Sequence, residues 1–190
     1  MMVYSTALFL HVIGALGLSV AFGLEWMGLS RLRYAMTAEQ ARMWIAAFAI
    51  LPRLYIPSAV AVLLSGLYMT ATVWGWGVGW TVVALAAMVL LAVLGAALTG
   101  PRMAAIGRAI VAKDEAGPIV LSQRLRDPFL WASIQIRVAI VVGIVFLMTV
   151  KPDLRGALLT ISVTAVLGLA LTIPIWRRDH AIDSVAPSNG

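Results

Sequence analysis

The sequence contains no cysteine and only two histidines, His11 and His180, among its 190 residues. Without cysteine the chain cannot form a disulfide, an iron–sulfur cluster, a thiolate metal site or a thiol nucleophile. Two histidines are too few for a multi-histidine metal cluster. These absences exclude disulfide-stapled folds, thiol enzymes and multi-histidine metal centres.

Charged residues are also scarce. Asp, Glu, Lys and Arg together make up 12% of the chain, whereas 62% of the residues are apolar and the mean hydropathy is +0.99. Soluble domains carry about 25% charged residues, so this composition does not suit a water-exposed surface. Because a membrane span takes about 20 apolar residues, the length allows roughly six or seven helices and no separate soluble domain. The composition therefore predicts an all-α polytopic membrane protein made of one helical bundle.

Long uncharged runs divide the chain into five predicted spans. The first 24 residues carry no charge, and the apolar run continues past Glu25. The uncharged stretch between Arg53 and Arg102 would make a single helix of roughly 72 Å, more than twice the hydrocarbon thickness, so it must fold as a hairpin. The glycines of residues 74–79 mark its turn. The predicted spans are 3–29, 54–73, 79–100, 128–150 and 156–176, which form a bundle over 1–176 followed by a tail at 177–190.

A short helix is predicted ahead of the second span. Thr37-Ala38-Glu39-Gln40 has the capping-box pattern, in which the first side chain and the third residue after it bond each other's backbone N–H groups. Residues 41–51 follow, and Pro52 is expected to stop the helix. We expect this segment to lie at the membrane surface.

Basic residues gather on one side of the predicted spans. The opposite side holds only Lys151 and Arg155. By the positive-inside rule this asymmetry places the N-terminus outside and the C-terminus in the cytoplasm. The net charge of +6 then comes from basic residues that orient the protein in the membrane and face anionic lipid, and it does not indicate a surface for nucleic acid. The eleven basic residues on the cytoplasmic side are Arg31, Arg33, Arg42, Arg53, Arg102, Arg108, Lys113, Arg124, Arg126, Arg177 and Arg178.

The first span carries two stripes of residues at helical spacing. The polar members of the first stripe, His11 and Glu25, lie roughly 21 Å apart along one helix face, which we expect to point into the bundle. The second stripe has the small-xxx-small pattern that lets helices approach closely. The first stripe is His11, Gly14, Leu18, Ala21 and Glu25, and the second is Ala15, Ser19 and Gly23.

An imidazole within a membrane span needs a partner, and His11 is the only histidine in a predicted span. One interpretation makes His11 an axial ligand to haem iron or a proton relay. The other gives it a single hydrogen bond to a hydroxyl of another span, such as Thr70 or Thr149. Under the first interpretation, a haem bound within one chain would need Met69, Met148 or another methionine as its sixth ligand, or would leave that position vacant.

Glu25 and Arg137 are the only charges well inside the predicted spans. Counted from the cytoplasmic ends, they lie roughly 7 Å and 13 Å deep, a difference that long side chains can bridge. An unpaired charge at that depth would cost a few kcal/mol, so the two are predicted to form a buried ion pair, with Arg53 as the competing partner of Glu25. The pair would either fix the contact between two spans or serve as a proton, ion or anionic-substrate site.

Three short segments, Leu10–Ala15, Leu63–Tyr68 and Leu147–Pro152, resemble a family of bacterial integral membrane proteins of unassigned function. That family is similar in turn to copper-resistance D-type bundles and to membrane haem-containing protoporphyrinogen oxidases, which also begin with a leucine–histidine pair in the first span. The resemblance implies that His11 stands at the haem-binding position, with haem b as the cofactor and the inner membrane as the location. Ser19 replaces the aromatic residue expected after that histidine, and no lysine lies within a span; both departures from the pattern of the oxidases count against the oxidase activity.

Three classes of function fit these residues. The most specific is a haem-binding or redox bundle; the alternatives are a non-catalytic accessory or scaffold protein and a small-solute or ion permease centred on Glu25 and Arg137. No metal other than haem iron is expected. The expected partners are the lipid bilayer and either a second copy of the chain or a larger membrane complex. Nucleic acid is not an expected partner.

The asymmetry of basic residues makes the topology testable. A reporter fused after Gly190 should be active only in the cytoplasm, and one inserted between Gly75 and Gly79 should be active only outside, because the positive-inside rule fixes both ends of the hairpins. Activity of paired cytoplasmic and periplasmic reporters in whole cells measures this. Cytoplasmic activity of the Gly75–Gly79 insertion would contradict the predicted topology.

Overall fold

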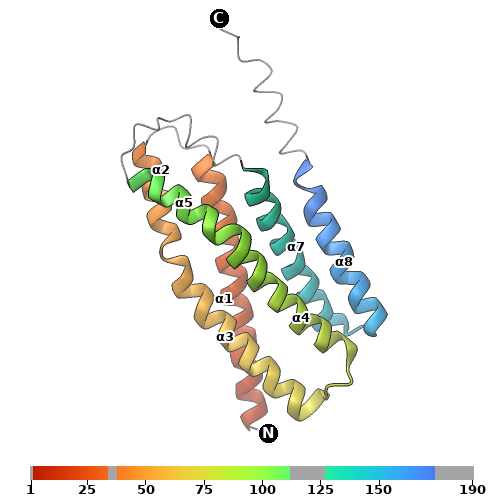
Figure 1. Ribbon diagram of the computed structural model, residues 1–190. Coiled ribbons are helices and arrows are strands. Elements are labelled where there is room, and N and C mark those ends of the chain that lie inside the picture. The colour runs from red at the N-terminus through yellow and green to blue at the C-terminus, as the bar shows by residue number, and fades with distance from the viewer. Residues whose placement is uncertain (1, 34–37, 112–126, 174–190) are drawn as a thin grey trace, which may run out of the picture.

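The computed structural model describes residues 2–33, 38–111 and 127–173, and within these ranges every regular element is a helix (Figure 1). Two short π-helical segments, η1 and η2, interrupt the α-helices. The elements are α1 (Met2–Arg33), α2 (Ala38–Phe48), α3 (Leu51–Met69), η1 (Thr70–Trp74), α4 (Gly79–Leu94), η2 (Gly95–Thr99), α5 (Gly100–Val111), α7 (Pro128–Val150) and α8 (Leu154–Ala170).

Four helical stretches are long and apolar enough to cross a membrane: Met2–Leu32, Met43–Trp74, Gly79–Arg108 and Phe129–Val150. The all-helical fold predicted from the sequence is therefore confirmed, and several of its helices have the length and hydropathy of membrane spans. The fifth predicted span, 156–176, corresponds to the shorter apolar helix α8, which ends at Ala170. The count of five spans and their orientation stay predictions, and the tail at 177–190 lies outside the described residues.

Large apolar side chains cover the outside of the bundle. Phe9 on α1 and Leu64 on α3 are 63% and 64% exposed, and Val89, Val142 and Val166 on the remaining long helices are exposed to a similar degree. Contiguous apolar surface of this kind marks contact with a membrane or a partner. It suits helices surrounded by lipid.

The helices pack as two close pairs, and a fifth helix packs against one of them. α1 runs along α3, α7 runs along α8, and α4 contacts both α7 and α8 (Figure 1). α3 and α4 are consecutive in the chain, yet they barely touch each other. The turn that joins them contains Gly75 at φ +79, a backbone conformation that favours glycine, so the hairpin turn predicted at residues 74–79 is confirmed.

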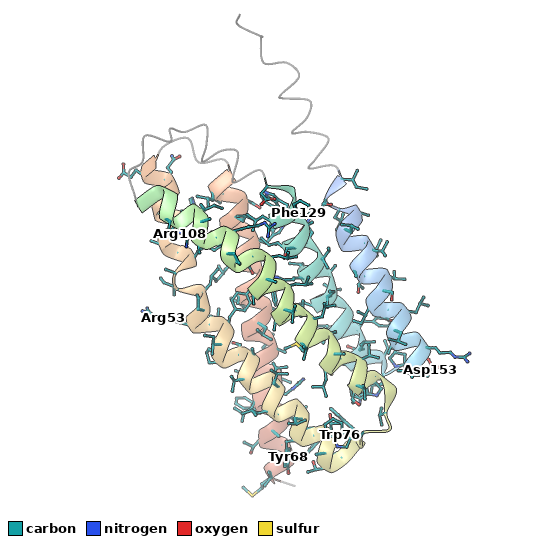
Figure 2. The ribbon with its side chains drawn as sticks, in the orientation of Figure 1. Arg53, Tyr68, Trp76, Arg108, Phe129 and Asp153 are labelled. Atoms are coloured by element: carbon teal, nitrogen blue, oxygen red, sulfur yellow. The ribbon has the colours of Figure 1, made fainter. Side chains whose placement is uncertain are left out.

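The two ends of the bundle carry different side chains (Figure 2). We call the end that holds Trp74, Trp76 and Trp80 the tryptophan end, and the end that holds Arg102 and Arg108 the arginine end.

Charged side chains fix the helix termini at both ends. At the arginine end, Asp127 accepts a hydrogen bond from the backbone N–H of Phe129 at 2.9 Å and pairs with Arg102 at 2.8 Å. At the tryptophan end, the Nζ of Lys151 lies 5.7 Å from the ring centroid of Trp74, and Asp153 accepts from the N–H of Gly156 at 2.8 Å. Such caps satisfy backbone groups that a helix end leaves without partners.

The short helix before the second span ends earlier than predicted. α2 covers Ala38–Phe48, and α3 begins at Leu51 with Pro52 in its first turn. Pro52 therefore opens α3 and does not stop α2, because proline lacks only an N–H that the first helical turn leaves unbonded anyway. Thr37, which begins the predicted capping box, lies outside the described residues.

Two glycines allow backbones to approach closely. A Cβ added at Gly14 on α1 would lie 2.9 Å from the carbonyl oxygen of Ser58, and one at Gly168 on α8 would lie 2.8 Å from that of Gln135. The first stripe of α1 therefore faces the bundle as predicted. The second stripe makes no such close approach at Gly23, where an added Cβ would have nothing within 4 Å. Only one face of α1 can contact α3, and spacing alone does not tell which of two small-residue stripes that is.

We expect Gly14→Ala and Gly168→Ala each to destabilise the bundle by about 1 to 3 kcal/mol, because the new methyl group would push against a backbone carbonyl. Gly23→Ala is the matched control, since nothing lies within 4 Å of its added Cβ. Removal of a glycine from a helix should leave that variant unchanged or slightly more stable. Unfolding midpoints in detergent measure the effect, and equal midpoints for all three variants would contradict the close packing.

Candidate functional site

A cavity of about 830 Å³ lies between α1, α3, α4 and α7. His11 and Glu25, at opposite ends of the inward face of α1, both line it. Most of the other lining side chains are aliphatic or aromatic, which is typical of pockets for hydrophobic ligands and cofactors. We call it the central cavity, and its polar lining residues include His11, Glu25, Tyr55, Thr70, Thr81, Thr99, Arg137 and Thr149.

Polar side chains from α1, α3, η2 and α7 meet at the arginine-end half of the central cavity. Arg137 donates from Nη2 to the Oε2 of Glu25, and the hydroxyl of Tyr55 donates to the same oxygen. The Nη1 of Arg137 also donates to the Oγ1 of Thr99 at 3.2 Å, and the hydroxyls of Thr99 and Ser133 lie 3.1 Å apart. We call Glu25, Tyr55, Thr99, Ser133 and Arg137 the polar cluster.

The surroundings hold the guanidinium of Arg137 in place. Glu25 and Arg137 are each only 5% exposed. The Cζ of Arg137 lies 5.1 Å from the ring centroid of Phe22, and that ring in turn packs edge-on against Tyr55. A Cβ at Gly95 would lie 3.0 Å from Nη1 of Arg137, so glycine leaves the room that the guanidinium occupies. η2 begins at Gly95, and π-helical turns are frequent at functional sites.

The structure brings Glu25 and Arg137 together, as the scarcity of buried charge predicts, and does not bring Arg53 to them. Arg53 is exposed and lies on the outer side of α3 (Figure 2). Because Arg53 and Tyr55 are two positions apart, they lie on nearly opposite faces of the helix, so the face that presents Tyr55 to Glu25 turns Arg53 away.

Tyr55 and Thr99 are members of the polar cluster that sequence reasoning missed. The available signal for Tyr55 is weak: a phenol set one turn after Pro52 within an otherwise uncharged run. Thr99 gives no signal of its own, because a threonine in a helix usually bonds a carbonyl of its own helix. Arg137 reaches the hydroxyl of Thr99 because η2 lies at the matching depth beside α7, which the sequence does not reveal.

His11 is anchored to α3 through one ring nitrogen. Its Nδ1 lies 3.2 Å from the carbonyl oxygen of Val62 and 3.2 Å from the Oγ of Ser65. A carbonyl accepts only, and the Ser65 hydroxyl gives its own hydrogen to Ala61, so Nδ1 must carry the proton and donate. The neutral ring then has its lone pair on Nε2, to which no described residue is bonded.

The prediction that His11 bonds the hydroxyl of Thr70 or Thr149 is wrong. Thr70 donates to the carbonyl of Gly66 at 2.9 Å, and Thr149 donates to the carbonyl of Val145 at 2.7 Å. Both hydroxyls are therefore satisfied within their own helices, as is common for threonine in apolar surroundings. Ser65 supplies the hydroxyl near His11 instead.

The two methionines considered as haem ligands differ in position. Met148 on α7 lines the central cavity, as His11 does. Met69 is fully buried and is not among the residues that line the cavity. A third methionine, Met88 on α4, also lines it. Of the two predicted candidates, only Met148 shares a space with His11.

Comparison with known proteins gives no relative: the chain matches no protein-family model, no curated protein and no solved structure. The resemblance drawn from its short segments therefore stays a hypothesis.

The pairing of Glu25 with Arg137 can be tested by a double-mutant cycle. Glu25→Gln or Arg137→Gln alone should cost about 3 to 5 kcal/mol, because each leaves the other charge buried and uncompensated. The double variant should recover much of that loss. Unfolding midpoints in detergent measure all three variants.

Arg102→Gln is the matched control for this cycle. It removes an arginine from the pair with Asp127, whose side chains are 29% and 28% exposed, and should cost about 0 to 1 kcal/mol. Strictly additive losses for Glu25→Gln and Arg137→Gln would show that the two charges do not depend on each other.

Proposed function

We propose that this chain is a multi-pass protein of the bacterial inner membrane that binds haem b in the central cavity, with His11 as an axial ligand. The observation that carries the proposal is the hydrogen bond from Nδ1 of His11 to the carbonyl of Val62. Histidines that ligate metals typically donate their other ring N–H to a carbonyl or carboxylate, which fixes the tautomer and the orientation of the ring. Nε2 of His11 is left with its lone pair for a ligand.

The lining of the central cavity fits a haem group. Its volume of about 830 Å³ lies within the range of cofactor sites, and its walls are mainly aliphatic and aromatic. Gly66 lies against the imidazole, since a Cβ there would be 3.3 Å from Cε1 of His11. Met148 offers a thioether in the same cavity. A haem with histidine and methionine ligands supplies one-electron transfer.

The residues around His11 have separate tasks in this proposal. Val62 and Ser65 hold the ring and keep the proton on Nδ1. Leu18, Met88 and Ile144 line the cavity and exclude water, which influences the reduction potential of an iron centre. The charges of the polar cluster bond one another, and this favours a positioning role for Glu25 and Arg137 over ion transport.

Purified protein from haem-replete cells should show a strong absorption band near the blue edge of the visible range that shifts on reduction. His11→Ala should lose this band and the bound iron while it remains folded, because the axial nitrogen is gone. Thr149→Val is the control, since Thr149 lines the same cavity and bonds only its own helix.

A purely structural role for His11 predicts different results. If His11 only joins α1 to α3, the protein should be colourless and free of iron, and His11→Ala should cost about 0.6 to 2 kcal/mol, the range for hydrogen bonds between membrane helices. That result would remove haem binding and leave the accessory or scaffold function in its place.

A further inference from the structure

The central cavity is longer than a single planar cofactor. His11 and Glu25 both line it and lie on one continuous helix. At 1.5 Å per residue they are roughly 21 Å apart along α1. A porphyrin held at its centre by His11 would not extend from the iron to the polar cluster. A haem at His11 would therefore leave the arginine-end half of the cavity free, and we call this half the compartment.

One oxygen of the Glu25 carboxylate is available to accept a hydrogen bond from a ligand in this compartment. Both of its donors, the Tyr55 hydroxyl and Nη2 of Arg137, reach the same oxygen, Oε2. No described residue donates a hydrogen bond to Oε1. Glu25 lines the cavity, and Oε1 is not among the fully buried side-chain atoms of the described residues that lack a partner, so a ligand in the cavity that donates a hydrogen bond to Oε1 would gain affinity from the carboxylate.

The charge balance of the polar cluster favours a neutral ligand. Glu25 and Arg137 cancel each other, so a third charge brought into the compartment would have no counter-ion. Among the described residues, the Nε of Arg137 is the one buried side-chain polar atom without a hydrogen-bond partner. That nitrogen is too deeply buried for a ligand to reach, so the group of the cluster left for a ligand is the carboxylate of Glu25. A hydroxyl is the smallest neutral group that can donate to it.

Aromatic rings surround the polar cluster, whereas the middle of the cavity is aliphatic. Phe22, Phe48 and Tyr55 line the compartment, and the rings of Phe22 and Tyr55 meet edge-on at a centroid distance of 5.1 Å. Such rings favour an aromatic ligand ring packed among them. Toward His11 the lining changes to residues such as Ala59, Val62 and Leu91, which suit an aliphatic tail.

The compartment is accessible from the side of the bundle. α3 and α4, which form two of its walls, barely touch each other, and the cavity is not fully enclosed. The outer faces of both helices carry exposed apolar side chains such as Ile56, Val60 and Val93. A ligand dissolved in lipid could therefore enter between α3 and α4 without crossing water.

We infer that the arginine-end half of the central cavity binds a lipid-soluble phenol, of the prenylated hydroquinone class. Its hydroxyl donates to Oε1 of Glu25, its ring packs among Phe22, Phe48 and Tyr55, and its aliphatic tail extends toward the middle of the cavity. This site uses none of the atoms proposed to hold haem, so it stands or falls separately.

The test compares two ligands that share one ring and one tail, with hydroxyl groups on the ring of the first and methoxy groups on the ring of the second. The full-length protein in detergent is titrated with a short-tailed prenyl hydroquinone, kept reduced, and with its dimethyl ether. The hydroquinone should bind at one site per chain and at least about tenfold more tightly, because only it can donate to a carboxylate. Equal affinities for the two compounds would overturn the proposal.

Protein variants locate the site. Glu25→Met combined with Arg137→Met removes both charges together, a change that buried ion pairs usually tolerate, and it should abolish the preference for the hydroquinone. Thr149→Val, which changes a lining residue outside the polar cluster, should keep it. His11→Ala should lose any haem band and still prefer the hydroquinone, which separates the two proposals. An unchanged preference in the double methionine variant would place the binding elsewhere and contradict the site.

Discussion

Two opposite charges buried in an apolar bundle have to stay together, because separation of Glu25 from Arg137 would leave each in surroundings that cannot solvate it. Their contact joins α1 to α7, and the hydroxyls of Tyr55 and Thr99 extend it to α3 and η2. Each of these elements is thereby held at one depth relative to the others. The shape of the central cavity follows, since the same helices form its walls.

Much of the fold could be predicted from the sequence because water and lipid impose strong patterns. The predicted span 128–150 matches α7, which Asp127 caps and Pro128 begins. The end of α2 was less predictable, since Pro52 can close one helix or open the next. The buried ion pair was predictable because so few charges lie within the spans. Uncharged members of the cluster were not, because a tyrosine or threonine in a helix has several acceptable partners.

The partners of His11 show where sequence patterns stop being informative. That an imidazole in a span needs a hydrogen bond follows from its chemistry. Which residue supplies it depends on the rotation of α3 about its own axis. The close approach at Gly14 sets that rotation, and it brings the carbonyl of Val62 to the ring. Spacing within α1 carries no information about the rotation of α3, so Thr70 and Ser65 could not be told apart beforehand.

The separation of the ion pair along the chain also concerns the order of synthesis. Arg137 follows Glu25 by 112 residues, whereas Tyr55 follows it by 30. During synthesis, Tyr55 therefore enters the membrane long before Arg137. While α4 and α7 are still being made, α1 and α3 can already form the hairpin in which Tyr55 is the first donor to reach the carboxylate. Arg137 then reaches a carboxylate that Tyr55 already bonds, and its contact joins α7 to the pair formed by α1 and α3.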